Sequence, residues 1–263
     1  MEKACRAGTL VKCRQVAAGK GLADMAGHLR REVENIVWAT RDAAAAEGWR
    51  LYKTDWRFSY PLCPGVTQWL WPRFGYSAFQ GLTCLSQPDA PVSSDLFGKA
   101  FKHVFGKPCP GPATAGLVGG PHPHRPQFAG LRQRFAKWPV RFVDIDYPEA
   151  TPEAGYYPTE TLPEYLADLR KAVLGIAAED YDTRSEMAFL NGLPKEIDIS
   201  TVGLCYSSDR GPFAAYAITQ LLCGNLRVID EIRASGGPLY PIEVEALKKI
   251  EAAAEDIAAL AKA

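Results

Sequence analysis

Apolar residues recur with helical spacing in several parts of the chain. Between residues 21 and 48 they form a stripe at intervals of three and four, which predicts a helix. Its members are Leu22, Met25, Leu29, Val33 and Ile36. The same period predicts helices over residues 161–176 and 240–260, the last of them rich in alanine. Ser94 or Asp95 can cap a further short helix that reaches residue 105.

Short apolar runs in the second half of the chain predict strands. The clearest is residues 140–146, and residues 197–204 form another. Pro212 suits the first turn of a helix over residues 213–222. From residue 138 onward, predicted strands therefore alternate with predicted helices. This order favours an α/β fold with a mostly parallel sheet flanked by helices.

Residues 49–92 show no clear period and mix tryptophan, tyrosine and phenylalanine with proline. Two interpretations stay open: an extended arm that wraps a partner, or an aromatic cap over the chain's own core. A Pro/Gly-rich linker follows at residues 106–126. We therefore expect three parts: an irregular helical and extended N-terminal region (1–137), an α/β domain (138–238) and a C-terminal helix (239–263).

Charge and composition limit the classes of partner that the chain is expected to bind. The chain has 263 residues, 47% of them hydrophobic, and 30 basic against 30 acidic side chains. This balance argues against nucleic acid as the main partner. No run is long enough to form a transmembrane segment. Residues 1–20 are basic and poor in acids, which is typical of organelle transit peptides but also of a solvated or partner-bound arm.

Cysteine and histidine usage points to a reducing compartment and to no metal. The seven cysteines are scattered without Cys-x-x-Cys pairs, so neither a disulfide framework nor a zinc site is expected. His122 and His124 have suitable ligand types, with Cys109 available, but their flanking prolines indicate an exposed loop. We expect an intracellular protein, in the cytoplasm or on the matrix side of mitochondria, with no metal and no cofactor.

The strongest chemical candidate is Cys205, at the end of the predicted strand 197–204. A polar loop follows, and then the helix that Pro212 opens; the loop residues are Tyr206, Ser207, Ser208, Asp209, Arg210 and Gly211. Backbone N–H groups and a helix N-terminus near a thiol favour the thiolate and bind anions. Asp144 and Asp146 end the other predicted strand, at the same edge of the sheet. The alternative is a buried core cysteine before an ordinary turn.

Residues 205–224 resemble the active-site loop and following helix of the rhodanese superfamily, with Ala214-Ala215, Leu221-Leu222 and Gly224 in the family's places. Residues 140–147 resemble its first core strand, although Asp144-Ile-Asp146 stands where the family has an Asp-x-Arg motif. The resemblance covers residues 138–238 and implies a rhodanese-like fold. It also implies that the Cys205 thiolate attacks a sulfane sulfur and passes it on as a persulfide, with Arg210 and the loop N–H groups holding the anion.

Loop length and the rest of the chain leave two functions open. Four residues separate Cys205 from Arg210, as in sulfurtransferases, whereas phosphatases and arsenate reductases of that fold have one more. The first hypothesis is therefore a cysteine-persulfide sulfurtransferase. The second is a non-catalytic structural or accessory subunit of a larger assembly, such as an organellar complex. It would contact other protein subunits through residues 1–92 and the C-terminal helix.

Overall fold

The protein is described from a computed structural model. It describes residues 20–72, 74–77, 82–85, 89–109, 140–143, 156–197, 202, 206, 208–236 and 239–262. The helices in chain order are α2 (Lys20–Ala39), α3 (Arg41–Ala46), α4 (Asp95–Phe105), the 3-10 helix η3 (Thr159–Thr161), α6 (Leu162–Asp180), α7 (Glu186–Gly192), α9 (Pro212–Leu222), α10 (Val228–Ala234), α11 (Pro241–Ala252) and α12 (Ala254–Leu260). The strands are β1 (Arg50–Tyr52), β2 (Arg57–Cys63), β3 (Val66–Leu70), β4 (Phe74–Ser77), β5 (Leu82–Leu85), β6 (Val92–Ser94), β7 (Val140–Val143) and β8 (Tyr156–Pro158).

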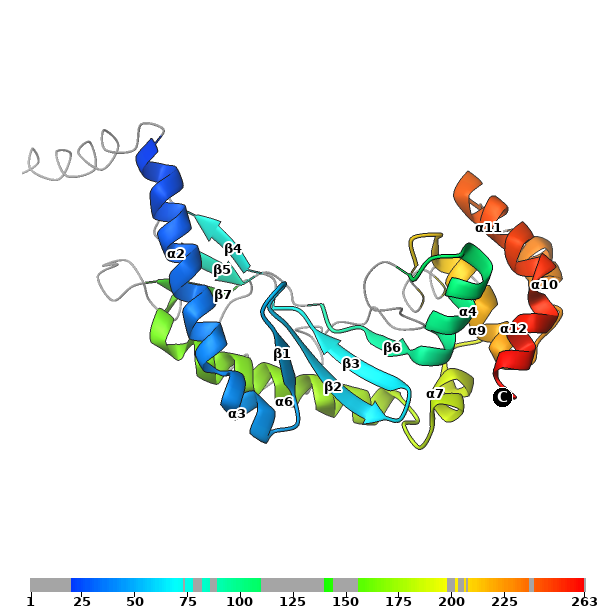
Figure 1. Cartoon of the computed structure of the whole chain (residues 1–263), viewed down its shortest axis with the longest axis horizontal. Coiled ribbons are helices and arrows are strands. Elements are labelled where there is room, and N and C mark those ends of the chain that lie inside the picture. Colours follow the sequence, from blue (N-terminus) through cyan, green and yellow to red (C-terminus); the bar gives the residue numbers. More distant parts are fainter. Residues whose placement is uncertain are drawn as a thin grey trace, which may run out of the picture.

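The molecule has two lobes along its long axis (Figure 1). One contains α2, α3, α6 and most of the strands, and the other contains α4, α7 and α9 to α12. The helices predicted over residues 161–176 and 213–222 are confirmed as α6 and α9. The predicted final helix is two helices, because the backbone leaves helical geometry at Ala253 (φ −111°, ψ 11°).

The described strands form two four-stranded sheets, in the orders β1-β2-β3-β6 and β4-β5-β7-β8. Every pair is antiparallel except β7 with β8. The expectation of a mostly parallel, rhodanese-like sheet is therefore wrong. The two strands described within residues 138–238, β7 and β8, are parallel, but β7 continues the sheet through antiparallel pairing with β5, a strand from before the expected domain. In the other sheet, β2 and β3 are joined by a tight turn at Pro64 and Gly65, and such short links permit only antiparallel pairing.

Residues 49–92 are also more regular than expected, because they supply β1 to β5 and the first residue of β6. The predicted strand over residues 197–204 is not found in its described part. Ile197 is irregular and Val202 is helical, and the Tyr206 N–H donates to the Val202 carbonyl at 3.0 Å. That bond has the spacing of a helical turn. The short apolar run was compatible with either structure, since its length does not distinguish them.

Two hydrophobic cores lie under one sheet. The N-terminal core joins α2 and α6 to Leu51, Phe58 and Leu70 of the sheet. The C-terminal core surrounds α9, whose residues 213–222 are all buried, and includes Val66 and Val92 of the same sheet. All five sheet residues point to the same face, so β1-β2-β3-β6 spans both cores. Each core combines residues from before and after residue 138.

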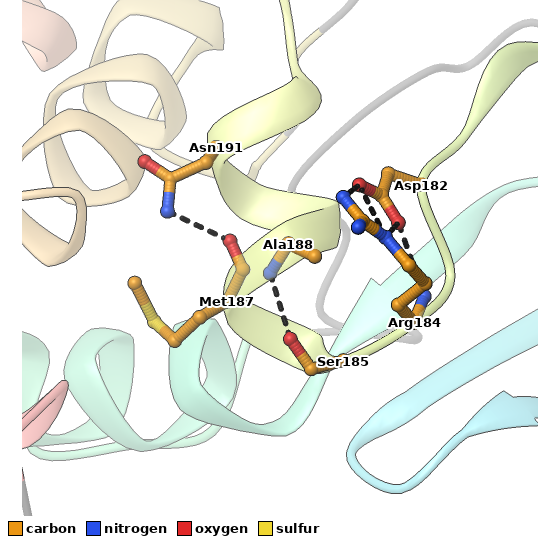
Figure 2. A network of polar contacts seen from close by, with 6 residues as sticks. All are labelled: Asp182, Arg184, Ser185, Met187, Ala188 and Asn191. Atoms are coloured by element: carbon orange, nitrogen blue, oxygen red, sulfur yellow. Dashed lines mark hydrogen bonds and ion pairs between the residues drawn. The ribbon is translucent and has the colours of Figure 1, made fainter.

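The segment between α6 and the second lobe is fixed by local contacts (Figure 2). Ser185 caps α7, since its hydroxyl accepts the Ala188 N–H at 3.0 Å. Asp182 and Arg184 form a forked ion pair just before the cap, with one contact of 2.8 Å. The next residue, Glu186, reaches away from α7: its Oε1 accepts the Leu96 N–H at 2.7 Å and the Ser94 hydroxyl at 2.6 Å. Glu186 thereby fixes the start of α4.

Candidate functional site

The loop expected to bind an anion serves mainly to pack the C-terminal core. Tyr206 is 1% exposed, and its ring meets that of Tyr216 edge to face at 5.2 Å. Its hydroxyl donates to the Pro194 carbonyl at 2.6 Å. The Ser208 hydroxyl donates to the Gly211 carbonyl at 2.8 Å and closes the turn. These side chains therefore stabilise the loop and the core beneath it.

The charged residues of the loop contact one another and α4. Asp209 accepts a bond of 3.1 Å from Lys107. Arg210 lies with its guanidinium carbon 5.4 Å from the centre of the Phe105 ring, and its Nε is 3.9 Å from Asp209 Oδ1. A cation over an aromatic ring is stabilised by the ring's negative face. Arg210 is thus placed against Phe105 of α4.

A carboxylate occupies the N-terminus of α9. Glu243, on α11, is 1% exposed, and its Oε1 accepts the Phe213 N–H at 3.2 Å. Its Oε2 accepts the Tyr240 N–H at 3.0 Å. One side chain therefore accepts a backbone N–H group at the start of each of two helices, α9 and α11. Glu243 was not predicted from sequence, although a glutamate three residues after the N-cap position, here Tyr240, is half of the capping-box signal.

Cys205, Ser207, Asp144 and Asp146 lie outside the described residues. Among the described cysteines, burial raises the pKa of the Cys63, Cys109 and Cys223 thiols. Each is therefore a protonated thiol at neutral pH. Within the described ranges, no group of three or more His, Cys, Asp or Glu side chains could hold a metal ion.

The other face of the sheet carries a second candidate site. Successive side chains of a strand alternate between the two faces of a sheet. The strand residues next to Leu51, Phe58 and Leu70 therefore point away from the N-terminal core. On β1 to β3 and just beyond, they include aromatic rings and arginines, here called the aromatic–arginine face. Its members are Arg50, Tyr52, Arg57, Trp69 and Trp71.

Cations and rings contact each other throughout this face. The Arg57 guanidinium lies 4.6 Å from the Trp69 ring centre, 5.1 Å from that of Tyr52 and 5.7 Å from that of Trp71. Arg50 lies 4.9 Å from the Tyr52 ring centre. Trp69 and Trp71 stack at 6.2 Å, and the Trp69 Nε1–H donates to Ser93 at 2.8 Å. These contacts hold the rings in place without burying them fully.

A pocket of about 550 Å³ opens where this face meets α2 and the start of β4. It is lined by Arg30, Glu34, Asp55, Trp56, Trp71, Pro72 and Phe74. Trp56 has a positive φ of 55°, which a non-glycine residue rarely adopts, and its ring meets Trp38 edge to face at 6.5 Å. Unfavourable backbone geometry of this kind persists where the surroundings enforce it, often at ligand sites. The volume is within the range of small-molecule pockets, about 300–1,000 Å³.

The charged groups of the pocket are already paired within the chain. Arg30 Nε donates to Glu34 Oε1 at 2.7 Å, an i,i+4 pair on α2. Arg57 Nε lies 3.3 Å from Asp55 Oδ2 at the pocket's edge. Neither the pocket nor the aromatic–arginine face was identified from sequence, although residues 1–92 were expected to contact a partner.

Comparison with known proteins gives no family for this chain. A scan against protein-family models, a search of curated proteins and a search of solved structures each found no match. None of the described helices combines the length and the apolar character needed to cross a membrane.

Proposed function

We propose that the protein is a non-catalytic accessory subunit that binds a protein partner through the aromatic–arginine face. The proposal follows the second of the two hypotheses from sequence. The sulfur-transfer hypothesis depended on a parallel sheet with a strand ending at Cys205, and the described sheets are of another kind. The better support therefore comes from the sheet of the first lobe.

The observation that carries the proposal is the composition of the outward face of β1 to β3. Tyr52, Trp69 and Trp71 are only half-buried, although large rings on a sheet surface would normally be covered. Tryptophan, tyrosine and arginine are the residues most enriched at the energetic centres of protein interfaces. Rings fixed by stacking and hydrogen bonds lose little entropy on binding. The face thus has the chemistry and the rigidity of a docking surface.

Charge identifies the kind of partner. Arg50 contacts the Tyr52 ring and has no acidic partner within the described residues. Arg57 is balanced by Asp55, so Arg50 is the basic group of this face that is open to an acidic partner. A partner segment with acidic side chains beside apolar ones would complement it.

The test is site-specific photo-crosslinking from Thr67, a half-buried position on the same face, followed by binding measurements with the purified captured protein. We expect the crosslinked segment to be acidic. Trp69→Ala and Arg50→Gln should each weaken binding at least tenfold, and binding should weaken as salt increases. Tyr240→Ala is the matched control, since Tyr240 is a 69% exposed aromatic residue in the other lobe.

Two results would overturn the proposal. One is equal loss of binding in Tyr240→Ala and Trp69→Ala, which would place the interface elsewhere. The other is a native mass measurement from the source in which the protein is entirely a free monomer.

A further inference from the structure

The pocket beside the aromatic–arginine face has a lining suited to one kind of chemical group. Three of its residues, Trp56, Trp71 and Phe74, present aromatic rings, and two, Glu34 and Asp55, present carboxylates. Aromatic rings attract cations through their negative faces, and carboxylates pair with them directly. Both features therefore favour a positively charged ligand.

Both carboxylates keep an unused oxygen. Glu34 uses Oε1 for Arg30, and Asp55 uses Oδ2 for Arg57, while their second oxygens have no polar partner among the described residues. A carboxylate offers about four acceptor positions. The two side chains are 23% and 40% exposed, so a ligand in the pocket could reach them.

The single cation in the lining does not favour an anion. Arg30 is 64% exposed, and its Nε already donates to Glu34. An anionic ligand would have to compete with Glu34 for that guanidinium and would face Asp55 as well. The chain itself shows that these rings accept a guanidinium, because Arg57 lies 5.7 Å from the Trp71 ring centre.

We propose that this pocket binds a protonated alkylguanidinium or alkylammonium group, whose charged end pairs with Asp55 and Glu34 and whose alkyl part contacts the rings of Trp56, Trp71 and Phe74. The inference goes beyond the proposed docking function and does not depend on it. The volume of about 550 Å³ leaves room for a ligand larger than the cationic group alone.

The experiment is calorimetric titration of the full chain with butylguanidinium, and with 1-pentanol as the neutral probe of similar length. We expect saturable binding of the cation and at least tenfold weaker binding of the alcohol. Asp55→Asn should weaken binding of the cation at least fivefold. Asp42→Asn is the matched control, because Asp42 is an exposed carboxylate paired with Arg41 outside the pocket.

A second variant removes a ring without disturbing the backbone. Trp56→Asn suits the positive φ, since asparagine adopts that conformation more readily than other non-glycine residues. It should keep the fold, as judged by circular dichroism, and should also weaken binding of the cation at least fivefold. Agreement between this variant and Asp55→Asn would support a site formed by rings and carboxylate together.

The cation could belong to a free small molecule or to an arginine side chain of a protein. A blocked peptide, acetyl-Gly-Arg-Gly-amide, distinguishes the two sources. Binding at least as tight as that of butylguanidinium indicates a side chain, and weaker binding indicates a free molecule. Absence of saturable binding by either cation would overturn the proposal. So would equal binding of 1-pentanol, or unchanged binding in both Asp55→Asn and Trp56→Asn.

Discussion

The Glu243 carboxylate at the start of α9 leads to a quantitative prediction for Gly211→Ala. Gly211 has φ 93°, and a Cβ at this position would overlap the Glu243 carboxylate. With ψ 163° this is a backbone region that essentially only glycine adopts, so a side chain there costs about 1–3 kcal/mol. Displacing the carboxylate also breaks charge-assisted bonds to the Phe213 and Tyr240 N–H groups, each worth about 1.5–3 kcal/mol. Together these give a destabilisation of about 4–9 kcal/mol.

Gly224→Ala is the matched control. Gly224 has a similar φ of 88°, but a Cβ there would meet no atom within 4 Å. Gly224→Ala should therefore lower the free energy of unfolding only by the cost of a side chain at positive φ, about 1–2 kcal/mol. In a Glu243→Ala background the destabilisation by Gly211→Ala should fall to its backbone part, about 1–3 kcal/mol, because the overlap is gone. The coupling free energy between residues 211 and 243 is then the part due to the lost bonds, about 3–6 kcal/mol.

The measurement is urea unfolding followed by far-UV circular dichroism, with the free energy of unfolding obtained by linear extrapolation. Equal destabilisation by Gly211→Ala and Gly224→Ala would refute the reasoning. A coupling free energy within about 0.5 kcal/mol of zero would refute it as well, since independent sites are additive to that accuracy. Either result would mean that the carboxylate does not hold the N-terminus of α9.

Three further predictions concern ionisable groups. Arg170 is 1% exposed, and its Nε is paired with Glu47 at 2.9 Å. Glu47→Ala should lower the free energy of unfolding by about 3 kcal/mol and Arg170→Met by less, because only the first substitution leaves a buried charge without its partner. The opposite order in urea unfolding would contradict this. The hydrogen bonds from Arg184 lower the pKa of Asp182 to about 2. The stabilisation of the fold by the ionised Asp182 is therefore complete above the unfolded pKa of 3.8 and is lost as pH falls through 2. A carboxyl carbon NMR titration should show this midpoint, and Arg184→Gln should raise it towards 3.8, in part only because the backbone N–H of residue 184 still donates to Asp182. Burial raises the pKa of Tyr216 to about 12. The stabilisation of the fold that comes from keeping this phenol neutral is complete below pH 10 and is lost as pH rises through 12. If Tyr216→Phe removes no phenol that titrates near pH 12 in an ultraviolet titration, this prediction is wrong.

The parts of the fold that sequence predicted are those specified by local signals. The cap at Ser94, the proline at the start of α9 and the apolar stripe of α6 each lie within one element. The capping box that ends in Glu243 was also visible, but its reach to Phe213 was not, because a contact 30 residues away leaves no local pattern.

The sheet of residues 49–92 was missed because both of its faces look alike in sequence. Two of the three outward positions of β3 and its extension, Trp69 and Trp71, are not polar. One inward position, Gln68, is 2% exposed, and its amide donates to the Ala90 carbonyl at 2.8 Å. The usual alternation of apolar inside and polar outside is therefore reversed in places. The pocket was missed for a related reason, since its lining comes from α2, the β1–β2 turn and the chain after β3.

The two cores under one sheet connect the docking surface to the stability of the whole molecule. β3 places Leu70 in the N-terminal core and Val66 in the C-terminal core, while Trp69 between them points outward. Separating the lobes would require breaking this strand, so the lobes should unfold in a single transition. A ligand held on Trp69 at a hundred times its Kd would then protect both lobes by about 2.7 kcal/mol. Occupancy of the surface could consequently be read by hydrogen exchange in α9, far from any contact with the ligand.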